Sequence, residues 1–523
     1  MVLPLPLVPL PASAIVGEGR MPVTESMRVI GDSPAAIQLM DAVAHRTGIR
    51  LTTTDVAEPG AITLRVESGA APTEGYRLSI GENLQIVGGD EAGLFYGVQT
   101  LVQLLTEESG VWSLPRVEIV DAPRFPRRGV MLDVTRHFFD VAEVKRFIDE
   151  TSALKYNHLH LHLSDDQGWR IQIDSWPKLT ELSSASAADG DRGGFYTKDE
   201  YREIVAYAAA RHMIVIPEID LPGHTHAIGV AYPDLVEEPV LNDALVSQAK
   251  ELGQPLPVKG EPYLGWGVGH SSVRIHEERT YEFVRDVIRE LVELTPGPYI
   301  HIGGDESLGT PQADFDLFAE RATAIVVEEG KIPVAWHEMG SAAGIAEGTV
   351  GQYWGMTTPS ETHAAEAARF VERGGALIVS AADAAYLDMK YTPDFPLGLT
   401  WAAVVDVQRA YSWDPVAVLD VPDSAILGIE APLWSETTRT YADVEQLVFP
   451  RAAALAEVAW SPQEGEGRDW ESFRGRIASL APGWRARGVN FHASPEIDWA
   501  SPEIDWASPE IDWASPEIDG VEQ

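Results

Sequence analysis

The chain has 523 residues, more than one compact domain of ordinary size needs, with the 45% hydrophobic and 23% charged content of a globular protein. Its 39 Lys+Arg against 80 Asp+Glu give a net charge of −41, which repels phosphate backbones and anionic headgroups and excludes nucleic acid and membranes as expected partners. With 0 Cys, disulfides, thiol catalysis and thiolate metal sites are excluded as well.

Residues 1–20 are apolar but are interrupted by Pro4, Pro6, Pro9 and Pro11, and the first positive side chain is Arg20. A secretory signal peptide has a charged start and an unbroken apolar core, so this leader predicts an extended segment packed on the body of the protein. No stretch approaches the ~20 apolar residues that span a bilayer. We therefore expect a cytoplasmic protein.

Residues 1–125 mix alternating apolar runs with helical spacing, which predicts a small non-catalytic α/β domain that includes the extended leader. The tetrapeptide Gly-Gly-Asp-Glu occurs here at 88–91, between a predicted strand and a predicted helix, and again at 303–306. In the first copy Asp90 is placed to cap the helix and Glu91 to complement its dipole. We expect this copy to be structural.

From residue 126 to 492 short apolar strands alternate with helical patterns. In the segment 281–294, for example, apolar residues at 284, 287, 288 and 291 have the spacing of an amphipathic helix. Eight strands alternating with helices predict a parallel (β/α)8 barrel, a TIM barrel, after the small α/β domain. The predicted strands are 128–134, 158–164, 213–220, 299–306, 332–338, 349–354, 376–382 and 426–434.

Acids and tryptophans gather at the ends of these strands, where the active sites of such barrels lie. Tryptophan faces stack on the apolar face of a sugar while carboxylates accept hydrogen bonds from its hydroxyls, so this composition indicates a sugar pocket. The strand-end residues are Arg136, Asp165, Asp220, His224, Asp305, Glu306, Trp336, Trp354, Tyr386, Asp388, Trp434 and Glu436.

The second Gly-Gly-Asp-Glu ends a predicted barrel strand, where two glycines allow irregular backbone and both acids can turn toward the barrel mouth. Adjacent acids repel each other, so the pKa of one should rise, as a general acid requires near neutral pH. A salt-bridged pair is the weaker alternative, because neighbouring strand ends offer more acids than bases. Asp305 and Glu306 are therefore the candidate catalytic pair.

Three histidines, His158, His160 and His162, alternate along one predicted strand and could mimic a metal site. Alternation is the ordinary periodicity of a strand, and a barrel interior can satisfy imidazoles by hydrogen bonds, so we expect neither a metal nor a cofactor. Asp220 has two open interpretations, because it can hold the following Pro-Gly-His turn or act as a ligand of the site.

Eight motifs follow one another along the chain: RGVMLDVTRHF, HLHLHLSDDQGW, PEIDLPGHTHA, HIGGDE, AWHEM, QYWG, YLDMKY and APLWSE. The series resembles the β-N-acetylhexosaminidases of glycoside hydrolase family twenty, bacterial members above all, over about residues 20–499. The resemblance implies an exo-acting, retaining enzyme that releases N-acetylglucosamine or N-acetylgalactosamine from oligosaccharides such as chitooligosaccharides. It also implies substrate-assisted catalysis, in which the substrate's acetamido oxygen forms an oxazolinium intermediate.

The resemblance implies a role for each matching residue. Glu306 matches the general acid and base, Asp305 the residue that orients the acetamido group and stabilises the oxazolinium charge, and Tyr386 the hydroxyl that hydrogen-bonds the acetamido oxygen. Asp165 and His224 match a supporting polar network near the acid. The residues that match the walls of the sugar pocket and the ligands of the sugar hydroxyls are Arg136, Trp336, Trp354, Asp388, Trp401, Trp434 and Glu436.

Two other functions fit parts of the sequence. Gly-Gly-Asp-Glu is also the signature of cyclases that make cyclic dinucleotides, but the charge of −41 and the barrel pattern argue against a nucleotide site. A catalytically inactive amino-sugar-binding protein is the more serious alternative, and the presence of both Asp305 and Glu306 disfavours it. The sequence leaves open the preferred amino sugar, the natural aglycone and the oligomeric state.

The segment 493–523 repeats the heptapeptide Ala-Ser-Pro-Glu-Ile-Asp-Trp. The proline in each copy excludes a long helix, and the segment carries acids without any base. We expect an exposed tail that is mostly disordered, with only the first copy packed on the protein.

Truncation after Trp499 should therefore leave folding and turnover intact, because the later copies are too polar and too often broken by proline to bury a core. Thermal unfolding of the full chain and of a chain that lacks residues 500–523 checks this. A drop of several degrees in Tm on truncation would show that the later copies pack.

Overall fold

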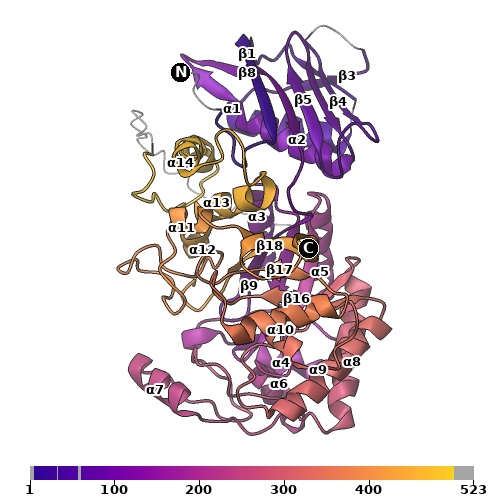
Figure 1. The fold of residues 1–523 in the computed structure, drawn as a ribbon, viewed down its shortest axis with the longest axis vertical. Coiled ribbons are helices and arrows are strands. Elements are labelled where there is room, and N and C mark those ends of the chain that lie inside the picture. The colour runs from indigo at the N-terminus through magenta and orange to yellow at the C-terminus, as the bar shows by residue number, and fades with distance from the viewer. Residues whose placement is uncertain (1–4, 32, 57–59, 500–523) are drawn as a thin grey trace, which may run out of the picture.

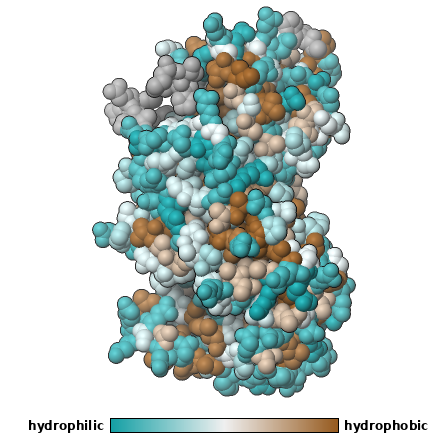
Figure 2. Space-filling model, viewed as in Figure 1, coloured by the Kyte–Doolittle hydropathy of each residue, from teal (hydrophilic) through white to brown (hydrophobic). Residues whose placement is uncertain are grey.

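The computed structural model describes residues 5–31, 33–56 and 60–499, and the expectations for the later tail copies lie outside this range. An N-terminal sheet domain is stacked on a barrel along the long axis of the molecule (Figure 1). On the face drawn in Figure 2 hydrophilic residues cover much of the surface, interspersed with smaller hydrophobic patches. Within the described residues no helix is long and apolar enough to cross a membrane.

The N-terminal domain is a mixed sheet with strand order β1-β8-β5-β6-β4-β2-β3, and β7 pairs with β8. Helices α1 and α2 contact each other and pack on the sheet. Asp90 caps α2, as predicted, because its carboxylate accepts hydrogen bonds from the backbone of Gly93 and Glu74 at 2.7 and 2.8 Å. The elements are β1 Ser13–Pro22, β2 Arg28–Ile30, α1 Pro34–Thr47, β3 Thr52–Thr54, β4 Ile62–Val66, β5 Tyr76–Ile80, β6 Leu84–Gly88, α2 Glu91–Gln103, β7 Thr106–Glu108 and β8 Val111–Asp121.

The eight predicted strands form a closed parallel barrel in the order β10-β13-β14-β15-β16-β17-β18-β9, which confirms the predicted fold. Its strands are β9 Arg127–Asp133, β10 His158–His162, β13 Ile214–Glu218, β14 Tyr299–His301, β15 Ile332–Trp336, β16 Val350–Tyr353, β17 Leu377–Val379 and β18 Ile426–Leu433. A short hairpin, β11 (Ser164–Asp165) and β12 (Gly168–Trp169), follows β10.

Helices follow most barrel strands, but between β15 and β16 the connection holds only a 3₁₀ helix, η3 (His337–Ser341). The apolar stripe predicted for residues 281–294 lies on the buried face of α8. The helices are α3 Val141–Ser152, α4 Lys178–Ser183, α5 Lys198–Ala209, α6 His226–Ala231, α7 Asp243–Leu252, α8 Glu278–Leu294, α9 Gln312–Glu328, α10 Glu361–Glu372, α11 Val407–Tyr411, α12 Tyr441–Val448, α13 Arg451–Trp460, α14 Trp470–Ala478 and α15 Ala481–Ala486.

The leader bridges the two domains, because Leu7 lies in the core of the sheet domain and Val8 bonds Gln103 of α2, whereas the first tail copy packs on the barrel side. The leader packs on the last helices, where Glu457 accepts a hydrogen bond from the backbone of Leu10 at 2.9 Å and Arg476 donates to the carbonyl of Leu7 at 2.6 Å. The first tail copy packs too, because Trp499 lies 5.0 Å from the ring of Phe491.

A buried ionic cluster joins the sheet domain to the barrel. The Asp121 carboxylate at the end of β8 accepts hydrogen bonds from Tyr76 Oη at 2.6 Å, from Lys155 Nζ at 3.0 Å and from Trp460 Nε1 at 3.0 Å. Lys155 and Trp460 belong to the barrel, whereas Asp121 and Tyr76 belong to the sheet domain. The side chains of Lys155 and Asp121 are 1% and 0% exposed, so the ammonium has no access to water.

Asp121→Ala should destabilise the whole chain by about 3–5 kcal/mol, because it leaves the Lys155 ammonium buried without its counter-ion. Urea unfolding of the full-length protein measures this loss. Glu118→Ala, at an exposed position of the same strand, is the matched control and should change stability little. A loss below about 1 kcal/mol for Asp121→Ala would contradict the role of this cluster.

Candidate active site

The backbone after β14 takes a conformation that only glycine permits. Gly303 has φ 67° and Gly304 has φ 109°. A Cβ on Gly303 would lie 1.7 Å from Asp220 Oδ1, and one on Gly304 would lie 2.5 Å from Met339 Cγ. The next acids leave this turn at the barrel mouth, and Glu306 itself has φ 46°. The two glycines therefore set the direction of both acids.

Asp305 and Glu306 both face the imidazole of His224. Its Nε2 lies 3.7 Å from Asp305 Oδ2 and 3.6 Å from Glu306 Oε2. The Asp305 side chain is 10% exposed, and that of Glu306, at the rim, is 34% exposed. Desolvation raises the pKa of Glu306 to about 7; the charge of His224 lowers this pKa, and the smaller effect of Asp305 raises it. One of the two adjacent acids thus holds a proton near neutral pH.

Asp165 connects the cations of the site. Its carboxylate lies 2.8 Å from Arg136 Nη2, 3.1 Å from His224 Nδ1 and 2.7 Å from His162 Nε2. Burial raises the pKa of Asp165, but Arg136 and His224 outweigh it and hold that pKa well below its usual range. Burial lowers the pKa of His224, but Asp165 and the neighbouring acids raise it well above its usual value. The imidazole is therefore held as a cation beside the two acids.

Asp220 is fully buried and has a structural contact in the site. Its Oδ1 accepts a hydrogen bond from the backbone of Gly304 at 3.0 Å and so holds the second Gly-Gly-Asp-Glu turn, whereas its Oδ2 is buried without a partner among the described residues. Burial and the charge of Asp305 raise the pKa of Asp220 well above its usual value.

The predicted aromatic residues come together but differ in depth. Trp336 is fully buried, donates its indole N–H to Glu218 at 2.9 Å and lies 6.0 Å from the ring of Trp434. It therefore lies beneath the exposed surface of the site. Trp401 is 49% exposed, and its ring stands edge-on to Trp354 and to Tyr386 at 5.8 Å from each.

Several buried polar atoms of the site have no hydrogen-bond partner among the described residues. They are Asp305 Oδ1, both carboxylate oxygens of Asp388, Glu436 Oε2 and His224 Nε2. Burial and the charge of Glu436 raise the pKa of Asp388 well above its usual value. Each unsatisfied buried group costs about 1–3 kcal/mol, so the arrangement is complementary to a ligand rich in hydroxyl and amide groups.

The comparisons with known proteins agree with this chemistry. The model of the glycosyl hydrolase family 20 catalytic domain matches residues 125–463, and that of domain 2 of the same family matches residues 5–122. The chain belongs to glycosyl hydrolase family 20. It is a glycosidase, and the family expected from the motifs is confirmed.

Relatives of this glycosidase match over most of its length. A β-N-acetylhexosaminidase of Cellulomonas fimi is 38% identical over 453 residues, which are 85% of this chain and 86% of the relative. A family 20 β-N-acetylglucosaminidase of known structure is 51% identical, with TM-score 0.87, and covers 94% of this chain and 99% of its own. A mutant Streptomyces plicatus β-hexosaminidase in complex with the product N-acetylglucosamine is 43% identical, with TM-score 0.87, over 95% of this chain and 98% of its own.

Two acids of the glycosidase site, Glu218 and Glu338, were not among the site residues predicted from the sequence. Glu338, in the turn after β15, accepts hydrogen bonds from the indole N–H of Trp354 at 3.0 and 2.9 Å. Glu218 on β13 lies 2.9 Å from His301 Nδ1 and also binds His162 and Trp336. Both acids could have been found from the period-two spacing of the predicted strands, because Glu218 lies two residues before Asp220 and Glu338 lies two residues after Trp336.

The three histidine side chains of β10 are buried within the barrel. His160 lies 2.8 Å from Glu430 and 3.0 Å from Glu218, and His162 lies 2.7 Å from Asp165. His158 lies 2.6 Å from the side chain of Asn157. The imidazoles thus pair with carboxylates and an amide of the barrel interior.

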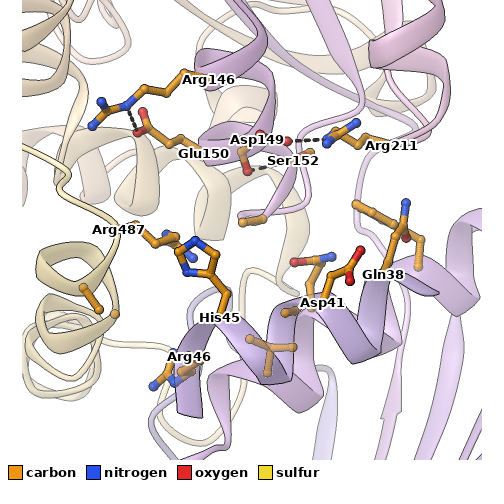
Figure 3. Close-up of a pocket in the computed structure, with 17 residues that line it drawn as sticks. Gln38, Asp41, His45, Arg46, Arg146, Asp149, Glu150, Ser152, Arg211 and Arg487 are labelled. Atoms are coloured by element: carbon orange, nitrogen blue, oxygen red, sulfur yellow. Dashed lines mark hydrogen bonds and ion pairs between the residues drawn. The ribbon is translucent and has the colours of Figure 1, made fainter. Parts of the chain in front are cut away.

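A separate cavity of about 500 Å³ lies between α1, α3 and α15, at the junction of the two domains (Figure 3). Its wall carries both acids and arginines, and two of the acids are paired with arginines. Arg146 binds Glu150 at 3.0 Å, and Arg211 binds Asp149. None of the strand-end residues lines it, so this cavity is not the candidate site.

Proposed function

We propose that this glycosidase is an exo-acting, retaining β-N-acetylhexosaminidase that removes terminal non-reducing N-acetylglucosamine or N-acetylgalactosamine from oligosaccharides such as chitooligosaccharides. One observation carries the proposal: two adjacent acids converge on one imidazole at a barrel mouth that presents unpaired polar groups. The names of the relatives support it. The inactive sugar-binding alternative lacks such support.

Glu306 acts as general acid in the first step and as general base in the second. Its pKa of about 7 leaves a proton on the carboxyl at neutral pH, which it donates to the oxygen of the leaving group. Its 34% exposed side chain lies at the rim, where the leaving group departs. As a carboxylate, Glu306 then takes a proton from the water that opens the intermediate.

Asp305 stabilises the intermediate but forms no bond to the sugar. Its Oδ1 is buried without a partner and can accept the acetamido N–H, which turns the acetamido oxygen toward the anomeric carbon. That oxygen attacks, the glycosidic bond breaks and an oxazolinium ion forms, whose positive charge the carboxylate opposes. Tyr386, 2% exposed beside Trp401, donates its hydroxyl to the acetamido oxygen.

The remaining polar residues hold the sugar hydroxyls. Arg136 is fixed by Asp165 at 2.8 Å and by stacking of its guanidinium 4.8 Å from the Trp434 ring. Its donors are therefore preorganised, and the free oxygens of Asp388 and Glu436 accept hydroxyl hydrogens nearby. A sugar that lacks the matching hydroxyl leaves these fixed groups without a hydrogen bond and therefore binds more weakly.

The pH dependence of turnover should report Glu306. Because the general acid must be protonated, kcat/KM should fall about tenfold per pH unit above its pKa of about 7 and be less affected just below it. Initial rates on an unactivated chitooligosaccharide across this range measure the profile. Glu306→Gln should remove the alkaline limb along with most of the rate, and a limb that survives this substitution would assign it to another group.

Leaving-group dependence should separate the two acids. Glu306→Gln should lose most rate on poor leaving groups and least on activated aryl N-acetylglucosaminides, which depart with little help from a proton. Asp305→Ala should lose rate on both, because both substrates pass through the oxazolinium ion. Steady-state kinetics of the three proteins on an aryl glycoside and an oligosaccharide checks this pattern.

Substrate assistance itself is tested with a 2-hydroxy glucoside, which nearly fits the pocket but has no internal nucleophile. We expect hardly any turnover of the aryl glucoside compared with the aryl N-acetylglucosaminide. Efficient hydrolysis, or a covalent glycosyl bond to Asp305, would replace the mechanism by the two-carboxylate one. Lack of turnover on both compounds, with tight binding of N-acetylglucosamine, would favour the inactive binding protein.

A further inference from the structure

Three potential metal ligands converge close to the sugar pocket but outside the residues assigned to catalysis. His337 lies in η3, directly after β15, and His363 and Glu366 lie one turn apart on α10. One ligand atom from each falls within 4.8 Å of the others. The His337 Nε2 lies 3.9 Å from Glu366 Oε2, and the His337 and His363 rings are 4.7 Å apart.

His337 is the unusual member of this group. It is fully buried, and neither of its ring nitrogens makes a hydrogen bond to a described residue. A neutral imidazole has one donor and one acceptor nitrogen, and burying both without partners costs free energy. A buried imidazole nitrogen that has no partner among the described residues, and that lies 3.9 Å from a carboxylate and beside a second imidazole, is a potential metal ligand.

We propose that His337, His363 and Glu366 bind a divalent transition-metal ion of the zinc class. Two imidazoles and one carboxylate are the ligand types that Zn²⁺ accepts in three-residue sites, with water in a fourth position. His363 and Glu366 are only half-buried, so the ion can enter from solvent and keep that water. At bond lengths of about 2.0–2.2 Å the ligand atoms of a tetrahedral ion lie about 3.3 Å apart. The 3.9 Å contact therefore has to close by about 0.6 Å, and the contacts of His363, whose ligand atom lies within 4.8 Å of the others, by up to about 1.5 Å.

The surroundings of His337 fit this assignment. Metal-bound histidines usually donate their second ring N–H to a carboxylate, which fixes the tautomer. Nδ1 of His337 lies 3.3 Å from Glu338 Oε2, on the side away from Glu366. An ion on Nε2 places the proton on Nδ1, the ring nitrogen that lies 3.3 Å from Glu338 Oε2 without a hydrogen bond in the present geometry. Because Glu338 also binds Trp354, the ion is connected to a wall of the sugar pocket through two contacts.

The other clusters of this kind in the described residues lie in the barrel interior or in the glycosidase site. In the group of His160, His301 and Glu218, the carboxylate already binds His162 and Trp336, and the group is enclosed in the barrel interior. The groups around Asp165 and Asp305 belong to the glycosidase site. The His337 cluster is the one whose central imidazole has both nitrogens free while its partners reach solvent.

The test is zinc binding by the full-length protein after removal of metal with a chelator. Equilibrium dialysis against Zn²⁺ should give one equivalent more for the wild type than for His363→Ala or Glu366→Gln, whose affinity at this site should fall about tenfold or more. Both substitutions are at half-buried positions, which spares the folded core. His276→Ala is the matched control, because His276 is 70% exposed and pairs with Asp314 alone.

Co²⁺ gives an independent readout of the same site. The wild type and His276→Ala should show the visible d–d absorption of a four-coordinate ion with imidazole ligands, and the two ligand variants should lose it. Equal zinc stoichiometry and affinity in the wild type and both ligand variants would overturn the proposal. So would a cobalt spectrum that survives in His363→Ala.

Discussion

The site depends on one buried carboxylate, Asp165, which binds Arg136, His162 and His224 at the same time. Without it, a guanidinium and two imidazoles would share a water-poor space with no common counter-ion. With it, the Arg136 guanidinium is held in place and His224 is held as a cation beside the acids of the second Gly-Gly-Asp-Glu. The hairpin after β10 carries this carboxylate, so a short local element positions charges from three strands.

The same arrangement separates the acids by protonation state. Asp165 faces cations, so its pKa is held well below the usual range, whereas partial desolvation raises the pKa of Glu306, whose side chain is 34% exposed, to about 7. His224 limits that rise, because its positive charge favours the ionised form of Glu306. A chain with a net charge of −41 thus keeps one carboxyl protonated at neutral pH by local desolvation. The positive charge of the neighbouring His224 keeps the pKa of Glu306 close to physiological pH.

The fold could be predicted from the sequence because period-two and helical spacings are local, and all eight marked strands are in the barrel. The strand ends could be named for the same reason. Contacts between strands could not be predicted from the sequence. The burial of Trp336, the partners of Glu218 and the hydrogen bond from Trp354 to Glu338 all depend on which strands are neighbours. The 3₁₀ helix after β15 was equally hidden, because its few residues have no period to detect.

The two copies of Gly-Gly-Asp-Glu show why a motif acquires chemistry only through its backbone. In the first copy Asp90 is extended, with φ −151°, and its carboxylate is fully engaged by the amides of Gly93 and Glu74. In the second copy two left-handed glycines turn the chain, and Asp305 keeps a buried oxygen that nothing in the described protein binds. A capping carboxylate accepts hydrogen bonds from its own helix, whereas an acid after a tight turn keeps oxygen atoms that can accept hydrogen bonds from a ligand. Identical residues therefore cap a helix in one domain, and in the other we propose that they bind substrate.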